Sequence, residues 1–284
     1  MQVTGKVKIP NGKRVAVNIG CDFDAASVWM GSIKRSSPVY LSRGEFGAEV
    51  GAPRLLKLFD KYQIKTTWFI PGHTVDTHTD VCKEVFARGH EIGHHGYVHE
   101  DITNLSYEEE VKILEMGLES LAKIGIKPSG YRSPAWDYSP NTLSILEKYG
   151  FRYDSSLMGN DIYPYRPRPV LEVNMDKANV FGPPSSIVEF PVSWFLDDFP
   201  TQEFVLGFLE GMRSTQEVFE RWKAIFDYAC DQEDGACFIL TLHPQTSGRA
   251  HMLPMLERLI QHMSEKGAWF ATLDEIRNAY YEEN

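Results

Sequence analysis

The sequence predicts a single-domain α/β protein in which parallel strands close into a barrel with helices outside. Two observations lead to this prediction. Strand-like and helix-like segments alternate along most of the 284 residues, a pattern typical of repeated βα units. Polar residues follow several of the apolar runs, and the carboxyl ends of barrel strands are where active sites form. Roughly six or seven such units favour a barrel over an open sheet.

The predicted elements follow one another along the chain. Residues 14–24 form an apolar run that ends in polar residues, as in a buried strand. Leucines at helical spacing predict a helix over 52–62, and β-branched and aromatic residues predict a strand over 65–70. Ser106 and Glu109 have the spacing of a capping box, which opens a helix through Leu121. Further helices are predicted at 79–88, 141–149, 216–229 and 252–265, and further strands at 91–94, 130–132, 151–155, 187–192, 237–243 and 268–272.

Two stretches, 28–46 and 159–184, do not fit this alternation. They are interpreted as long irregular insertions in one domain that spans residues 1–284. Loops of that length usually serve a function, as lids or as contacts between subunits. The insertions therefore predict a homo-oligomer, with a tetramer as one candidate.

Composition narrows the classes of function. The formal charge is 29 − 39 = −10, and no long basic stripe is present, which disfavours nucleic-acid binding. No segment has the ~18 consecutive apolar residues that a membrane helix needs, so no membrane partner is expected. The start of the chain lacks the pattern of a signal peptide, and the four cysteines form no Cys-x-x-Cys pair. Both observations favour reduced thiols and a cytoplasmic location.

The clearest chemical signal is His95 and His99, because two histidines four residues apart can hold one metal ion. Asp22 and Asp24 stand where the first strand ends. Two histidines and one carboxylate complete the protein ligands of a divalent metal and leave positions open for water and substrate. We assign Asp24 as the third ligand and Asp22 as the general base. The alternative is that one of the two aspartates merely caps a turn.

Other polar or aromatic residues near strand ends are candidates for the same site. Arg132 is placed to pair with Asp22 and orient it, and the backbone N–H of Tyr131 to face an oxyanion. His243, at the tip of an apolar strand, fits a general acid for a leaving amine. Trp136 and Trp194 are candidates for the wall of a substrate pocket. Each also has a structural interpretation: an ion pair for the arginine, a backbone-bonded buried side chain for the histidine, and core packing for the tryptophans.

Together these residues resemble the polysaccharide deacetylase family, the carbohydrate esterase family 4 group that shares the NodB homology domain. The run from Leu41 to Leu56, Trp68 to His73, and Asp154 to Met158 resemble the branch of peptidoglycan deacetylase-like proteins and cyclic imide hydrolases. One departure is that Phe23 separates the two aspartates, which are adjacent in most of the family.

The resemblance implies a distorted (β/α)7-type barrel and a divalent metal, usually zinc. It implies Asp22 as the base, tethered by Arg132, and His243 as the general acid. Asp24, His95 and His99 are the implied metal ligands. Arg43 lies in the first of the resembling runs and is predicted to bind substrate.

The predicted function is metal-dependent hydrolysis of a non-peptide C–N bond, such as N-deacetylation of an amino sugar or a peptidoglycan-like substrate. The alternative is ring opening of a small cyclic imide or ureide by the same chemistry, for which the predicted lids would close a pocket. A remoter alternative is a non-catalytic binding domain on the same fold, which a missing ligand would favour; none of the expected ligands is missing.

Overall fold

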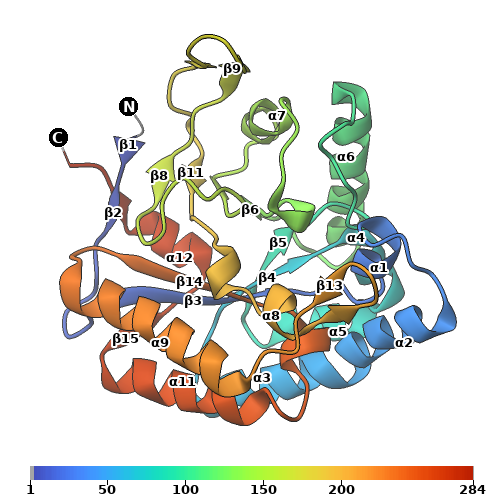
Figure 1. Ribbon diagram of the computed structural model, residues 1–284, viewed down its shortest axis with the longest axis vertical. Helices are drawn as coiled ribbons and strands as arrows, with labels where there is room; N and C mark the ends of the chain where they lie inside the picture. The colour runs from blue at the N-terminus through green and yellow to red at the C-terminus, as the bar shows by residue number, and fades with distance from the viewer. Residues whose placement is uncertain (1–2, 284) are drawn as a thin grey trace.

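The protein is described by a computed structural model covering residues 3–283 (Figure 1). Its main sheet is a curled run of parallel strands in the order β14 (Cys237–Leu242), β3 (Val15–Asp22), β4 (Thr67–Ile70), β5 (Glu91–His94), β6 (Gly130–Tyr131), β7 (Tyr153–Asp154) and β11 (Val188–Glu189). A single parallel bridge between Asp197 and Thr241 links the segment after β11 to β14. The two ends of the run thus meet at their carboxyl edge, as the predicted (β/α) barrel requires.

The sheet is extended at its borders by further strands, of which the sequence analysis predicts the one at 268–272 and misses the others. β8 (Tyr165–Arg166) pairs antiparallel with β11, and β1 (Val3–Thr4) pairs antiparallel with β8. β15 (Ala268–Phe270) lies parallel to the first half of β3. Near the two chain ends, β2 (Lys6–Val7) pairs with β16 (Tyr280–Tyr281) (Figure 1).

Alternation along β3 explains how one strand serves both the core and the site. Val15, Val17, Ile19 and Cys21 pack in the cluster under the helices. The alternate residues Ala16, Asn18, Gly20 and Asp22 face the barrel interior, because successive side chains point to opposite sides of a strand. Gly20 leaves room for a buried arginine, since a Cβ there would lie 3.3 Å from Arg132 Nη1.

Helices cover the outer face of the sheet. α3 (Ala52–Lys61), α9 (Thr215–Gln232) and α11 (Leu253–Glu265) lie along the outside of β3 and β14 (Figure 1). The predicted capping box is present at Ser106, where α6 (Tyr107–Lys123) begins. The remaining α-helices are α1 (Ser27–Gly31), α2 (Pro38–Phe46), α4 (Gly72–Thr77), α5 (Thr79–Ala87), α7 (Thr142–Lys148), α8 (Phe199–Gln202), α10 (Pro244–Ser247) and α12 (Leu273–Asn278). A π-helix, η1 (Gly47–Gly51), joins α2 to α3, and η2 (Pro134–Trp136) and η3 (Trp194–Leu196) are 3-10 helices.

The two predicted insertions are not irregular, which corrects that part of the sequence analysis. Residues 28–46 contain most of α1 and all of α2. Residues 159–184 contain β8 and a projecting hairpin of β9 (Val170–Glu172) and β10 (Val180–Phe181) (Figure 1). The strands of two or three residues are too short to show a period, and α2 buries only Gly44, so it has no apolar stripe that a sequence pattern could reveal.

The four cysteines are buried free thiols. Among residues 3–283, no helix is long and apolar enough to cross a bilayer.

Candidate active site

The site lies at the carboxyl edge of the parallel run, where Asp24, His95 and His99 converge. Asp24 Oδ1 is 3.5 Å from His95 Nε2 and 3.9 Å from His99 Nε2, and all three side chains are buried. Both carboxylate oxygens of Asp24 and the Nε2 of His95 lack a hydrogen-bond partner. Buried polar atoms are rarely left unpaired, so these orphaned atoms fit a set of ligands that share one cation.

Neighbouring contacts fix the two imidazole rings in the form that binds metals. His95 Nδ1 donates to the backbone oxygen of Arg132 at 2.7 Å. Ser32 Oγ donates to the backbone oxygen of His99, so it accepts from His99 Nδ1 at 2.6 Å. In both rings Nε2 then carries the lone pair toward Asp24. His99 also has a φ of 61°, a left-handed conformation that is uncommon outside glycine and is often found at functional sites.

The charges in this cluster suit cation binding. Burial opposes ionisation of Asp24, but His99 and His95 outweigh it and lower the pKa of Asp24 to about 2. Burial lowers the pKa of His99 to about 4. The cluster therefore offers an anionic carboxylate beside a neutral imidazole at physiological pH, as metal ligation requires.

Asp22 is held by Arg132, the pairing that the sequence analysis expects. Arg132 Nη1 donates to Asp22 Oδ1 at 2.7 Å, and neither side chain is exposed. The remaining guanidinium donors reach the backbone oxygen and the hydroxyl of Ser155 and the hydroxyl of Thr241. A guanidinium saturated in this way cannot rotate, so the carboxylate it holds is fixed in place.

His243 faces the cluster from the end of β14. Its Nε2 is 3.7 Å from Asp24 Oδ2, while its Nδ1 is 2.7 Å from Asp198 Oδ1. Asp198 also accepts the backbone N–H of His243 and the hydroxyl of Ser247. Burial would lower the pKa of His243, but Asp198 and Asp197 raise it well above its ordinary value. The ring is thereby kept protonated, as a general acid must be.

The sequence analysis missed Asp197 and Asp198. These two adjacent aspartates form no recognisable motif with a histidine, because His243 lies 45 residues away from Asp198 along the chain. The parallel bridge at Asp197 brings the two segments together. Burial raises the pKa of Asp197, and the charge of His243 opposes that rise.

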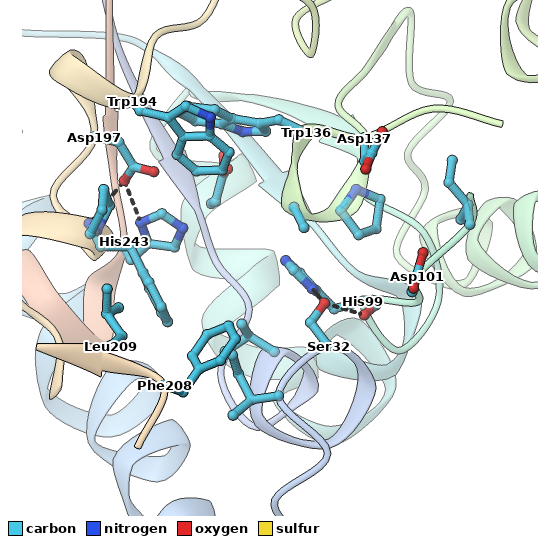
Figure 2. Close-up of a pocket in the computed structure, with 18 of the residues that line it drawn as sticks. Ser32, His99, Asp101, Trp136, Asp137, Trp194, Asp197, Phe208, Leu209 and His243 are labelled. Atoms are coloured by element: carbon cyan, nitrogen blue, oxygen red, sulfur yellow. Dashed lines mark hydrogen bonds and ion pairs between the residues drawn. The ribbon is translucent and has the colours of Figure 1, made fainter. Parts of the chain in front are cut away.

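A cavity of about 440 Å³ opens from this cluster. Asp22, His99, Asp197 and His243 are among its lining residues. Figure 2 shows His243 beside Asp197, with His99 across the cavity from them. We call Asp22, Asp24, His95, His99, Arg132 and His243 the catalytic wall. The rest of the lining is mostly apolar, and we call Trp136, Trp194, Phe199, Phe208 and Leu209 the aromatic wall. This wall adjoins the catalytic wall, since the rings of Phe199 and His243 have centroids 5.1 Å apart.

The aromatic wall includes both tryptophans that the sequence analysis proposed. Trp136 and Trp194 stack with ring centroids 4.4 Å apart. Phe208 and Leu209 come from a small hairpin of β12 (Phe204–Val205) and β13 (Leu209–Glu210). This closing hairpin was not predicted. No residue of the 159–184 insertion lines the cavity, whereas Val28, Ser32 and Ile33 of the first insertion do.

Two other predicted site residues lie outside the cavity lining. The ring of Tyr131 stacks on His94 with centroids 5.4 Å apart, and its backbone lies within the β-ladder between β5 and β7. The backbone beside the cavity belongs instead to Pro134, Ala135 and Trp136. Arg43 forms an ion pair with Glu203 and stacks 4.1 Å from the ring of Trp29. Its charge is thus engaged by the protein rather than presented to a ligand.

A buried carboxyl pair lies behind the site. Glu189 at the end of β11 and Asp154 at the end of β7 are fully buried. Ser156 donates its hydroxyl to Asp154 Oδ1 at 2.7 Å and accepts the backbone N–H of Ser133 at 2.8 Å. Burial raises the pKa of Glu189 well above its usual range, and the charge of Asp154 raises it further. Through Ser156, the pair supports the loop that leads to Trp136.

Comparison with known proteins agrees with this geometry. The family model for polysaccharide deacetylase matches residues 44–153. A peptidoglycan deacetylase of Helicobacter pylori is 36% identical over 291 residues, covering 96% of this chain and 98% of the relative. A peptidoglycan deacetylase-like protein of Gibberella zeae is 34% identical, covering 94% and 87% respectively.

A solved structure, a putative polysaccharide deacetylase from Mycobacterium smegmatis, superposes with a TM-score of 0.84 at 33% identity, covering 97% of this chain and 93% of that one. The fold and the site define an amide hydrolase built on a (β/α) barrel. The chain belongs to the polysaccharide deacetylase family.

Proposed function

We propose that this protein removes the acetyl group from the nitrogen of an amino sugar, in a saccharide or a peptidoglycan-like substrate. The observation that carries the proposal is the convergence of three ligand side chains, two of which (Asp24 and His95) have buried atoms without a hydrogen-bond partner, with a fixed base and a fixed acid. Asp22, His99 and His243 all line one cavity. Amide hydrolysis needs one group to take a proton from water and another to give a proton to the departing nitrogen.

The roles of the residues follow from their contacts. Asp22, oriented by its ion pair with Arg132, accepts the proton of the attacking water. His243 donates from Nε2 to the leaving nitrogen, and Asp198 stabilises the charged ring through Nδ1. Ala135, rather than Tyr131, offers the backbone N–H for the developing oxyanion, because Pro134 has none and Trp136 donates its own to the backbone oxygen of Ser133.

We propose a divalent metal, and zinc in particular, as the cofactor held by Asp24, His95 and His99. Two imidazoles and one carboxylate are a common ligand set for catalytic zinc. Such an ion polarises a carbonyl and acidifies water. Metal analysis of protein purified without added metal, with the Asp24→Asn variant as a control, tests both the site and the identity of the ion.

The activity is tested with zinc-loaded and chelator-treated protein on N-acetylglucosamine oligomers, measuring released acetate. Chelator-sensitive release supports the proposal. Absence of release from every N-acetylated sugar in the loaded protein refutes it.

A second candidate is hydrolytic ring opening of a small cyclic imide or ureide. The observation that favours it is the aromatic wall, because the apolar side chains of Trp194, Phe208 and Leu209 line a cavity of about 440 Å³, a volume typical of small-molecule sites. Succinimide and hydantoin in the same assay, followed by loss of ring absorbance, distinguish the two substrates.

We further propose a homo-oligomer, with a tetramer as one form, and a cytoplasmic location. Leu171, Val173 and Met175 on the projecting β9–β10 hairpin are exposed, and a second copy of the chain would shield them. Light scattering of the protein and of a variant with three serines at these positions tests the assembly. Cell fractionation tests the location.

A further inference from the structure

Three groups of the site lie just beyond the ends of their strands. Asp24 comes two residues after the end of β3, His243 one residue after the end of β14, and His99 five residues after the end of β5. The hydrogen bonds of the sheet end before these residues, so their spacing also depends on what packs against the loops that carry them. That spacing matters, because a displacement of about 1 Å can slow a reaction about a hundredfold.

The segment from α1 to η1, residues 27–51, packs against all three loops. It contains the first of the two insertions that the sequence analysis interpreted as lids or subunit contacts. In α1, a Cβ on Gly31 would overlap the backbone oxygens of Val98 and His99. The next residue, Ser32, bonds to both Nδ1 and the backbone oxygen of His99 (Figure 2). The end of α1 therefore fixes where the backbone of His99 lies.

The loop after Asp24 lies against α2. A Cβ on Gly44 would lie 2.5 Å from the backbone nitrogen of Ala26, so this approach requires a glycine. The segment also reaches Asp24 through α4: Ser27 Oγ is 3.0 Å from Thr74 Oγ1, and Thr74 donates to the backbone oxygen of Asp24 at 2.6 Å. Both contacts hold the backbone that presents the carboxylate of Asp24.

The loop after His243 lies against the continuation of the same helix. Gly47 and Gly51 begin and end η1, four residues apart, and so lie on one helix face. A Cβ on Gly47 would lie 3.1 Å from that of Gln245. A Cβ on Gly51 would overlap the backbone oxygen of Pro244. Glycine is less favourable than alanine inside a helix, so these glycines are explained by the close contacts that they allow.

An ion pair ties the same segment to the residues after His243. Arg43 of α2 pairs with Glu203, and Glu203 Oε1 accepts the hydroxyl of Thr246 at 2.8 Å. The backbone N–H of Thr246 donates to the backbone oxygen of His243 at 2.9 Å. Arg43 does not line the cavity, so its connection to the site runs through this chain of contacts.

We propose that the α1–η1 segment is a positioning element that sets the spacing between the metal ligands and the general acid. The inference rests on the proposed function and goes beyond it, because it assigns a role to residues that touch neither substrate nor metal. Gly31 and Gly44 place the backbone of the two ligands that follow β5 and β3. Gly47 and Arg43 place the backbone of His243.

The test compares two glycines that lie three residues apart on one helix. Gly44→Ala displaces the loop after Asp24, so we expect its zinc affinity, measured by competition with a chelating dye, to fall by about tenfold or more. Ser32→Ala is a milder second variant for the same effect, since it removes the hydrogen bonds to His99 and adds no atom. Its zinc affinity should fall by about tenfold. Circular dichroism establishes that each variant is folded.

Gly47→Ala requires Gln245 to move by a few tenths of an ångström, which shifts the general acid and leaves the metal ligands in place. We expect unchanged zinc affinity and a fall in kcat on N-acetylglucosamine oligomers of about tenfold. Aryl acetate hydrolysis should change by less than about threefold, because only the amide needs a proton on its leaving group. Arg43→Gln should show the same pattern. The control is Gly5→Ala, whose Cβ meets the ring of Tyr280 near the chain ends and which should leave all three quantities unchanged.

A folded Gly44→Ala protein that binds zinc as tightly as the wild type would overturn the proposal. If that variant does not fold, Ser32→Ala decides in its place. An equal change on the two substrates in Gly47→Ala and Arg43→Gln would also overturn it. If the wild type binds zinc but releases no acetate from any sugar, the proposed function is wrong and the zinc affinities decide the positioning role. A wild type that neither binds zinc nor hydrolyses either substrate overturns both.

Discussion

The two walls of the cavity are built by different means. The groups of the catalytic wall sit at or just after the ends of parallel strands, are buried, and are fixed by neighbouring strands, as Arg132 is by Ser155 and Thr241. The aromatic wall comes from short helices and a hairpin, and Trp194 on it remains 47% exposed. The difference teaches that the reaction is fixed by the barrel, while the choice of substrate is assigned to segments that can vary without disturbing it.

Removing a ligand from the catalytic wall should have the largest effect. Asp24→Asn keeps the shape of a buried side chain but removes the charge that the cluster needs. Loss of several kcal/mol of transition-state stabilisation predicts a fall in kcat of about a thousandfold. Zinc should raise the Tm of the wild type, because binding to the folded state stabilises it, and should not raise that of the variant.

The control for this prediction is Asp176→Asn, on the hairpin far along the chain from the ligands, which should keep both the activity and the zinc-dependent Tm. An Asp24→Asn protein that retained bound zinc and turnover would show that the catalytic wall does not hold the metal as we infer.

The next largest effect concerns the hydrogen bond between Asp198 and His243. Asp198→Asn leaves the ring of His243 in place but removes the charge that stabilises its protonated form. We expect kcat on an N-acetyl sugar to fall by about a hundredfold, the contribution typical of a general acid. Hydrolysis of an aryl acetate should change by less than about threefold, because its leaving group departs without a proton. An equal loss on both substrates would mean that Asp198 only maintains the fold.

The catalytic wall could be predicted from the sequence because its members follow strands in a repeating pattern. Asp22 and Asp24 end a clear apolar run, and His95 and His99 follow another. Each long element of the barrel has a period that the sequence displays, as in β3 and α6. The carboxyl ends of such strands meet at one edge, so pairing between residues as distant as Asp22 and Arg132 could be anticipated.

The aromatic wall could not be predicted in the same way. Its hairpin has two-residue strands, which show no alternation, and Asp198 reaches His243 only through a single bridge between distant segments. Tyr131 was assigned for its backbone N–H beside Arg132, but its backbone lies in the ladder between β5 and β7 and it does not line the cavity. Arg43 shows that a motif can mark packing rather than ligand contact.

Removing a ring from the aromatic wall tests whether this wall affects substrate binding alone or the chemical step as well. Trp194→Ala removes one of two stacked rings from a partly exposed position. Loss of an aromatic contact worth about 1–1.5 kcal/mol predicts a rise in KM of about tenfold with kcat little changed. Phe195→Ala is the matched control, since that neighbouring ring is 66% exposed and does not line the cavity. A fall in kcat as large as the rise in KM would show that Trp194 contributes to the chemical step as well as to substrate binding.

The smallest expected effect concerns the carboxyl pair behind both walls. Burial raises the pKa of Glu189 well above its usual range, so the folded protein holds a proton that the unfolded chain releases above pH ~4.5. This proton makes stability fall as pH rises from there, by up to ~1.4 kcal/mol per pH unit. Glu189→Gln mimics the protonated group, since its amide can donate to Asp154 while Oε1 still accepts from Ser156 and Leu157.

Urea unfolding between pH 5 and pH 8 should therefore show the variant gaining stability relative to the wild type as pH rises. Glu147→Gln is the contrasting control: hydrogen bonds from Ser185 and Ser186 outweigh desolvation and lower the pKa of Glu147. Its carboxylate contributes stability above the pKa of the unfolded chain, and that contribution is lost only as pH falls, so this variant should not gain with rising pH. If Glu189→Gln instead lost stability at every pH, the pair would be ionised. The hydrogen bond from Ser133 to Ser156 would then be supported by an ionised carboxylate. The aromatic wall would in that case depend on a buried charge, as the catalytic wall does.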